Sequence, residues 1–140
     1  EREYLARSRE FHPDFHADAS AIEQTQAERE SAALNEAYVT LKDPFKRAEY
    51  LLQLLGGPSA SEMKDIPQSF LMEMLDLREE IENAKGNDAK IQSLTLSLET
   101  RYAQELKSVE ALFDHNSPNF KQIRQALNAI KYIRGLIRDL

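Results

Sequence analysis

The sequence predicts an all-α protein, and three observations carry this prediction. Prolines and glycines are scarce, with five and four in 140 residues, while Ala, Leu, Glu, Lys and Gln are abundant. These abundant residue types favour helix over strand. Apolar residues recur three and four positions apart along most of the chain, as they do in amphipathic helices. The helix breakers cluster between these periodic segments, so they mark the turns between helices.

The first helix is expected over residues 2–11, and a proline stops it. One side of this helix is mainly apolar and carries Tyr4, Leu5, Ser8 and Phe11. The basic residues Arg2, Arg7 and Arg9 lie elsewhere on its surface. Pro13 lacks an amide hydrogen and its ring clashes with the preceding turn, so it cannot continue the helix. His12, Pro13 and Asp14 are therefore expected to form an exposed loop before the next helix.

Two more helices are expected between this loop and the first run of breakers. Ser20 can cap a helix that reaches about Leu41, because a serine side chain accepts a hydrogen bond from the first helical turn. The Asp43-Pro44 pair ends that helix and begins another, since proline is favoured at the first helical position. The third helix then keeps its apolar spacing as far as the glycines at 56 and 57.

Residues 56–67 read GGPSASEMKDIP, a composition typical of a linker between packed units. We therefore expect a first domain over residues 1–57, a linker over 58–65 and a second domain over 66–140. The second domain contains helical segments at about 66–85, 88–114 and 118–140, the last begun by Ser117 and Pro118. Three helices joined by short loops form an antiparallel bundle.

Charge and composition exclude several classes of function. A net charge of −6 argues against a general nucleic-acid binder, whose affinity comes mainly from clustered Lys and Arg. Without cysteine the chain forms no disulfide, no thiolate zinc site and no cysteine nucleophile. No apolar run approaches the roughly 20 residues of a membrane span, so we expect a soluble protein with no membrane partner. Glu1 is not a start methionine and the following residues already look helical, so we expect a segment upstream.

Metal binding or catalysis is the alternative interpretation of His12, Asp14, His16 and Asp18. Imidazole and carboxylate are common metal ligands, and two histidines four residues apart share one face of a helix. Pro13 breaks the backbone between them, however, and no HExxH-like pattern is present. Solvated loop residues are the better interpretation of His16, Asp18 and His115. No Gly-rich phosphate loop, nucleophile elbow or carboxylate pair is visible, so we expect no enzymatic activity, cofactor or metal.

The surroundings of the His-Pro-Asp tripeptide resemble a J domain. A basic helix precedes the tripeptide, and a longer helix that reads SAALNEAYVTLKDP follows it. The resemblance covers residues 1–57 and implies a helical hairpin with the tripeptide at its tip. It also implies that a DnaK-type chaperone binds this domain and is stimulated to hydrolyse ATP. The residues implicated are His12, Pro13, Asp14, Arg2, Arg7 and Arg9. The rigid loop would present the imidazole and the carboxylate, while the arginines would steer an acidic partner surface.

The continuation is similar to the HscB family of iron-sulfur cluster co-chaperones. The segments DPFKRAEYLLQLLG and SFLMEMLDLREEIE and the two helices after them extend the resemblance over nearly the whole chain. The Gly/Phe-rich segment and CxxCxGxG repeats of general J proteins are absent. The resemblance implies an L-shaped molecule, in which the bundle delivers an IscU-type scaffold protein to an HscA-type chaperone bound by the truncated J-domain hairpin. It implies scaffold contacts at Leu71, Met72, Leu75, Asp76, Glu79 and Tyr132.

The chain departs from the family pattern in several places. Phe15 follows the tripeptide where the family usually has lysine, and the first helix of the J domain is missing. The cysteine-rich extension of animal members is also missing, which favours the bacterial cytoplasm over the mitochondrial matrix. Asn83 stands where the family often has an acid, so it is left out of the scaffold site. The rival function is a general J-domain adaptor, or a plain helical interaction protein, with another client.

Helix geometry points to the same surface without the resemblance. At about 100° per residue, one stripe that we expect to face the core contains Phe70, Met74, Leu77, Ile81 and Ala84. Leu71, Met72 and Leu75 fall about 100° to 200° away from it, beside Asp76 and Glu79. An exposed apolar patch with an acidic border marks a protein-binding site, although Leu71 and Leu75 could instead flank a wide core face. Tyr132 lies near 200° from the apolar stripe of its own helix, so an outward interface tyrosine is expected.

Overall fold

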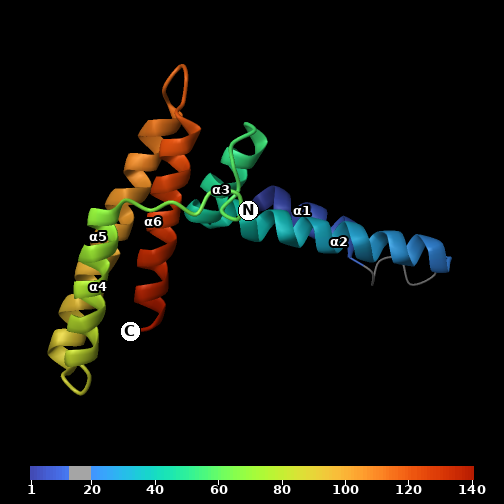
Figure 1. The fold of residues 1–140 in the computed structure, drawn as a ribbon. Helices are drawn as coiled ribbons and strands as arrows, with labels where there is room; N and C mark the ends of the chain where they lie inside the picture. Colours follow the sequence, from blue (N-terminus) through green and yellow to red (C-terminus); the bar gives the residue numbers. More distant parts are fainter. Residues whose placement is uncertain (13–19) are drawn as a thin grey trace. The chain divides into compact units, whose positions relative to one another are not determined.

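The computed structural model describes residues 1–12 and 20–140, except for the side chain of Phe11. The described residues form six α-helices and no strand, which confirms the all-α prediction (Figure 1). The helices are α1 (Arg2–Phe11), α2 (Ala21–Lys42), α3 (Pro44–Leu54), α4 (Gln68–Asn83), α5 (Asp88–Phe113) and α6 (Phe120–Arg138). None of the described helices is long and apolar enough to cross a membrane.

The chain divides into two compact units, Glu1–Arg47 and Ala48–Leu140, and the division falls inside α3. The sequence had suggested residues 1–57 as the first domain. The contacts assign residues 48–57 to the second unit because Glu49 bonds to α6 and Leu52 is almost completely buried. The functional division into a J domain, a linker and a partner-binding bundle stays a prediction.

The first unit is built on a hairpin of α1 and α2, which lie side by side (Figure 1). The rings of Tyr4 and Tyr38 stack with 3.9 Å between their centroids. The Tyr4 hydroxyl donates to Asn35 Oδ1 at 2.6 Å, and the Tyr38 hydroxyl donates to Glu1 Oε1 at 2.7 Å. Leu5, expected on the apolar side of α1, is exposed instead. Within the described residues, aromatic stacking and hydrogen bonds therefore join the two helices of this hairpin.

Side-chain caps set the starts of α2 and α3 where the sequence placed them. Ser20 Oγ accepts from the Glu23 amide at 3.2 Å, and Asp43 Oδ1 accepts from the Phe45 amide at 2.9 Å. The start expected at Ser117-Pro118 is wrong by two residues, because Asn119 Oδ1 caps α6 by accepting from the Gln122 amide at 3.1 Å. Helix α3 ends as predicted at the glycine pair, where Gly56 takes a left-handed φ of +86°.

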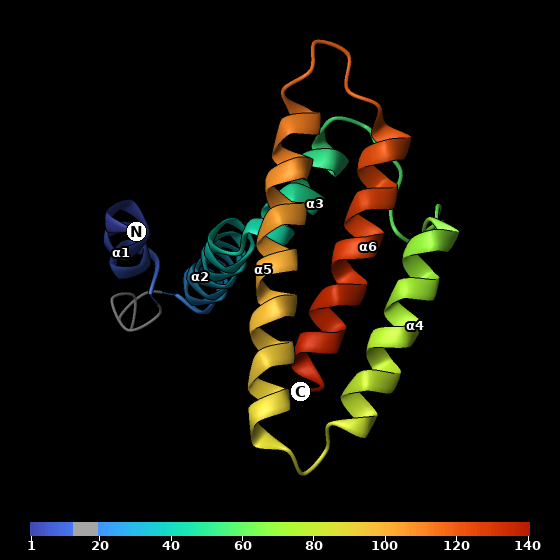
Figure 2. The same cartoon turned by 90° about the vertical axis from the view of Figure 1, so that its left-hand side faces the viewer.

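The second unit contains an antiparallel bundle of α4, α5 and α6 (Figure 2). Its core holds the predicted stripe of α4 and the apolar side of α6. The buried members of this core cluster are Phe70, Met74, Ile81, Leu98, Ala129, Ile133 and Leu136. Burial of a large apolar side chain contributes about 1.5 to 3 kcal/mol, so this cluster contributes strongly to the bundle's stability.

A buried polar network joins α3 and the segment before α4 to α6. Arg124 is only 1% exposed, and its two terminal nitrogens donate to the two carboxylate oxygens of Glu49 at 2.7 and 2.6 Å. Arg124 Nε donates to Asn128 Oδ1 at 3.0 Å. The Asn128 amide nitrogen in turn donates to the backbone carbonyls of Met63 and Asp65, each at 3.0 Å.

Candidate partner-binding sites

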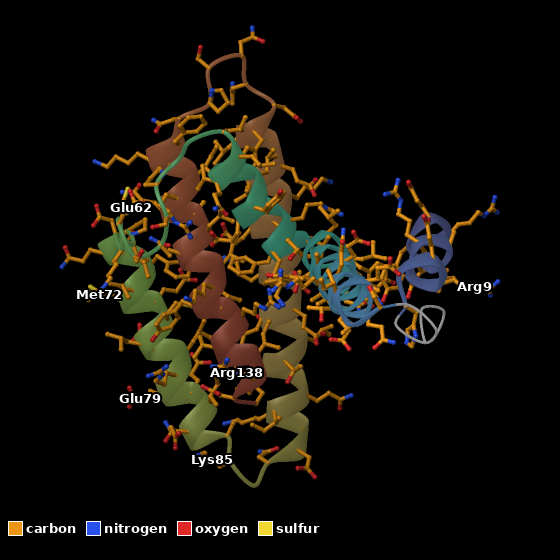
Figure 3. The ribbon with its side chains drawn as sticks, turned by 90° about the vertical axis from the view of Figure 1, so that its right-hand side faces the viewer. Arg9, Glu62, Met72, Glu79, Lys85 and Arg138 are labelled. Carbon is orange, nitrogen blue, oxygen red and sulfur yellow. The ribbon has the colours of Figure 1, made fainter. Side chains whose placement is uncertain are left out.

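The outer face of α4 carries an exposed apolar patch formed by Leu71, Met72 and Leu75. These side chains are 36%, 62% and 57% exposed, respectively, while Phe70 and Met74 beside them are buried. Met72 projects from α4 on the side away from α6 (Figure 3). The alternative in which Leu71 and Leu75 belong to a wide core face is therefore wrong. The helical period turns one set of apolar residues inward and leaves the other in water.

Carboxylates border this patch on the next helical turn. Asp76 follows Met72 by four residues and Glu79 follows Leu75 by four, so each acid lies beside an apolar member of the patch. Both acids are exposed, and Glu79 projects to the same side as Met72 (Figure 3). We call Leu71, Met72, Leu75, Asp76 and Glu79 the α4 surface. It combines apolar contact area with charges that can select a complementary partner.

Glu73 shares α4 with these acids but has a structural partner. Arg101 of α5 donates from Nη1 to Glu73 Oε1 at 2.6 Å, and Arg101 Nε donates to Glu105 at 2.9 Å. The hydrogen bond from Arg101 lowers the pKa of the Glu73 carboxyl, burial opposes this effect, and the positive charge of Arg101 lowers the pKa further. Glu73 therefore belongs to the contact between α4 and α5 rather than to the α4 surface.

Tyr132 lies at the boundary between core and surface. Its ring is half-buried and meets the ring of Phe70 edge-on, with 6.5 Å between centroids and 84° between planes. The guanidinium carbon of Arg78 lies 5.6 Å from the centroid of the same ring. The expected outward orientation is wrong, because the side of α6 that carries Tyr132 faces α4. Part of the ring nonetheless remains accessible to solvent, so a partner can contact it.

Arg78 is a residue that the sequence analysis missed. Its spacing from the buried Met74 is one helical turn, so it lies at the edge of the core stripe of α4. That spacing, together with an aromatic residue on a neighbouring helix, is the signal that could have identified it. A cation over a tyrosine ring is attracted by the negative face of the ring.

The predicted chaperone-binding residues that the structure describes are the three arginines of α1 and His12. His12 directly follows α1, is exposed, and has φ −63° and ψ 132°. Those angles are extended, as expected for a residue before proline, because the proline ring disfavours helical backbone angles at the preceding residue. Pro13 and Asp14 lie outside the described residues, as do Phe15, His16 and Asp18.

The three arginines of α1 are all exposed but differ in their surroundings. Arg7 forms an ion pair with Glu3 at 2.9 Å, four residues earlier on the same helix. Arg2 and Arg9 are exposed, and Arg9 projects from the surface of α1 (Figure 3). The local carboxylate partly neutralises Arg7, so Arg2 and Arg9 contribute more to attraction of an acidic partner. No group of three or more metal-ligating side chains occurs within residues 1–12 and 20–140.

A family model described as the HSCB C-terminal oligomerisation domain matches residues 66–140, which is more than half of the chain. The chain belongs to the HscB family. The match covers α4, α5 and α6, so the α4 surface and Tyr132 both lie in the part that defines membership of the HscB family.

Individual relatives agree with HscB membership over almost the whole chain. The mitochondrial J-type co-chaperone jac1 of Schizosaccharomyces pombe is 32% identical over 141 residues, covering 98% of this chain and 60% of the relative. The chain thus spans about three-fifths of the length of that curated relative.

Two solved HscB structures share the fold. The structure of chaperone HscB from Vibrio cholerae matches with a TM-score of 0.85 at 29% identity, covering 99% of this chain and 82% of the other. The crystal structure of human co-chaperone protein HscB matches with a TM-score of 0.87 at 24% identity, covering 99% and 69%. The first match supports HscB membership, and the second shows the fold.

Proposed function

We propose that this protein is a J-type co-chaperone of iron-sulfur cluster assembly. It binds a DnaK/HscA-type chaperone through His12, Pro13 and Asp14, with help from Arg2, Arg7 and Arg9, and stimulates ATP hydrolysis by that chaperone. Its bundle binds an IscU-type scaffold protein and delivers it to the chaperone for cluster transfer. The protein itself carries out no chemistry in this role and requires no cofactor.

The observation that carries this proposal is the exposed α4 surface on an otherwise well-packed bundle. Leu71, Met72 and Leu75 leave apolar area in water although neighbouring positions of the same helix are buried. Monomeric proteins seldom expose several large apolar side chains together unless another molecule covers them. The matched family model and the relatives named as co-chaperones support a protein partner for this surface.

Replacing Leu71, Met72 and Leu75 together with alanine tests the proposal. Interface anchors commonly cost about 1 kcal/mol or more each on truncation, so the triple variant is expected to weaken scaffold binding about a hundredfold. The melting temperature should change little, because these side chains are already exposed in the free protein. Isothermal titration with purified scaffold and a calorimetric melt measure the two effects.

Leu96→Ala is the matched control, since Leu96 is 67% exposed and lies on α5, outside the α4 surface. The control should bind the scaffold like the parent. A triple variant that also binds like the parent would exclude the α4 surface as the scaffold site and favour the rival adaptor with another client. The full chain is used because a fragment beginning at residue 58 would lack Glu49 and Leu52, which complete the second unit.

The cellular compartment is proposed on two opposing indications. The sequence analysis favoured the bacterial cytoplasm, whereas the fission yeast relative is named as mitochondrial. The mitochondrial matrix therefore stands as the second candidate. Expression of a tagged, full-length gene product in its own host, followed by fractionation, distinguishes the two locations.

A further inference from the structure

A hollow of about 650 Å³ lies in the second unit beside Tyr132. It is bounded by one side of α6, by Arg78 of α4, and by the segment before α4. The lining residues that matter here are Lys64, Ile66, Arg78, Lys131, Tyr132 and Gly135, with Arg138 and Asp139 at the end of α6. Figure 3 shows Arg138 at that end of α6, with α4 next to it. We call this the α6 hollow.

The α6 hollow has a strong excess of positive charge. Lys64, Arg78, Lys131 and Arg138 line it, whereas Asp139 is its one lining carboxylate. The distance from Arg138 Nε to Asp139 Oδ1 is 3.8 Å and both side chains are largely exposed, so this ion pair is weak. Neither Lys64 nor Lys131 has a hydrogen-bonding or ion-pair partner among the residues that the structure describes. Four cations at one site repel one another, so an anion entering the hollow would be attracted by all of them.

Folding accounts for only part of this charge. Arg138 lies in the last turn of α6, where a cation interacts favourably with the helix dipole. Arg78 stacks over Tyr132. Lys64 lies outside any helix and Lys131 lies in the middle of α6, so neither position gains from a helix terminus. These two lysines are unexplained by the fold.

The buried network holds one wall of the hollow in place. Asn128 donates to the carbonyls of Met63 and Asp65, the residues on each side of Lys64. Asn128 is itself fixed by Arg124, which is held by Glu49. The backbone that presents Lys64 is therefore rigid, and a rigid site loses less conformational entropy when a ligand binds.

The floor of the hollow suits a peptide better than a bare ion. Ile66 and Tyr132 supply apolar surface, and Gly135 has no side chain between them. A Cβ placed at Gly135 would meet only an Arg138 nitrogen, at 3.9 Å, so the space above this residue is open. A small anion would contact the cations but would gain nothing from the apolar floor. A peptide can use both through its side chains and its backbone.

Nucleic acid and lipid surfaces fit less well. The chain carries a net charge of −6, and the acids of the α4 surface lie on the same helix as Arg78. An extended polyanion would meet that negative charge on its way to the hollow. A short acidic stretch within a folded partner avoids it.

We propose that the α6 hollow binds an acidic peptide segment of the partner that docks on the α4 surface. The proposal rests on the proposed function for the identity of that partner. Tyr132 connects the two regions, because it belongs to the implied scaffold site and also lines the hollow. The partner would then contact the α4 surface with apolar and basic groups and the α6 hollow with an acidic segment. These two different contacts would fix the orientation in which the partner docks.

A labelled hexaglutamate peptide tests the hollow directly, with hexalysine and inorganic phosphate as comparison ligands. Fluorescence polarisation on the full chain should show binding of hexaglutamate that weakens as salt increases. Lys131→Glu and Gly135→Glu should each reduce the affinity about tenfold, the second by filling the hollow with a negative side chain. Lys107→Glu on α5 makes the same charge change outside the hollow and should leave the affinity within about twofold.

Calorimetric melts show whether each variant is folded, and Gly135→Ala separates the effect of helix propensity from that of charge. Binding of hexaglutamate that is equal in the parent and in both hollow variants would overturn the proposal. Competition by phosphate as effective as that by hexaglutamate would reduce the hollow to a general anion site and would also overturn it.

Titration of the same variants with purified scaffold separates this inference from the proposed function. Hollow variants that bind scaffold about fivefold to tenfold more weakly, with the loss disappearing at high salt, support the acidic segment. If the triple alanine variant of the α4 surface loses scaffold binding while the hollow variants keep it fully, the proposed function stands and the hollow proposal fails. If the parent does not bind scaffold at all, the proposed function fails, and hexaglutamate binding decides the hollow by itself.

Discussion

Tyr132 serves the core and the surface of the bundle at once. The edge-on contact with Phe70 joins α6 to α4, while Arg78 lies over the ring from the solvent side. An aromatic pair in this geometry contributes roughly 0.5 to 1.5 kcal/mol beyond its buried area. Under the proposed function, a substitution here is therefore expected to change stability and scaffold binding together, unlike a substitution at Met72.

Tyr132→Ala is expected to lower the free energy of unfolding by about 2 kcal/mol, because the ring is half-buried and its contact with Phe70 is lost. It should also weaken scaffold binding about tenfold. Tyr132→Phe keeps the ring and its packing, so it should behave like the parent in both respects. Urea unfolding and scaffold titration measure the two quantities. A Tyr132→Ala protein with parental scaffold affinity would confine the binding surface to α4.

Helix α4 presents different chemistry on each of its sides. Its core stripe packs in the bundle, its outer patch remains in water, and Glu73 holds it to Arg101 of α5. The Glu73 side chain is about half exposed, at 48%, so solvent screens this pair and its contribution to stability is modest.

The Glu73–Arg101 pair gives the bundle a defined pH dependence. The pKa of Glu73 is lowered by folding, so its ionised form stabilises the folded state at every pH above the unfolded value of about 4.5. That contribution is lost progressively as the pH falls below 4.5 through the folded pKa. The difference in free energy of unfolding between the parent and Glu73→Gln should therefore be constant from pH 7 to 5 and shrink below it. A difference that grows on acidification would contradict this.

The contact between α3 and α6 depends on a buried cation. Arg124 is buried whereas the Glu49 side chain is 28% exposed. Removal of Glu49 and removal of Arg124 are therefore expected to lower the stability by different amounts. Glu49→Ala leaves a buried positive charge without its counter-ion and is expected to cost about 3 to 5 kcal/mol. Arg124→Met leaves a carboxylate that water can reach, so it should cost less. Chemical denaturation of both variants and of the double variant measures the order, and equal costs would contradict it.

At the scale of the whole molecule, each of the two proposed partner sites lies in its own compact unit. His12 and the arginines of α1 belong to Glu1–Arg47, and the α4 surface and the α6 hollow belong to Ala48–Leu140. The units differ in packing: the described part of the first contains the Tyr4–Tyr38 stack, whereas the second contains a continuous apolar core. Changes in one site need not disturb the fold of the other unit.

His12→Gln and Asp14→Asn test this separation. Each is expected to abolish stimulation of the chaperone's ATPase while scaffold affinity and helix content remain parental. His12 is exposed and follows the end of α1, so its replacement is expected to leave the fold of the unit intact. Steady-state ATPase assays with and without scaffold, together with circular dichroism, measure these effects. Stimulation that survives both substitutions would exclude the J-domain function.

Much of this protein was determined by local features of its sequence. The six helices begin and end within about two residues of the predicted positions, because caps, prolines and glycines act within a turn of their own position. The two faces of α4 were also predictable. A period of 3.6 residues places Phe70 and Met74 on one side and Met72 on another, whatever the rest of the chain does.

Only the tertiary structure decided how many sides of a helix are covered. Helix α6 receives contacts from α5, α4 and α3, so Arg124 and Asn128 are buried and Tyr132 turns toward α4. Periodicity identifies residues that share a face, but it does not state how many neighbours pack around the helix. The assignment of residues 48–57 to the bundle and the gathering of Lys64, Arg78 and Lys131 around one hollow have the same origin. Both join residues far apart in sequence, and such contacts are set by packing of the complete chain.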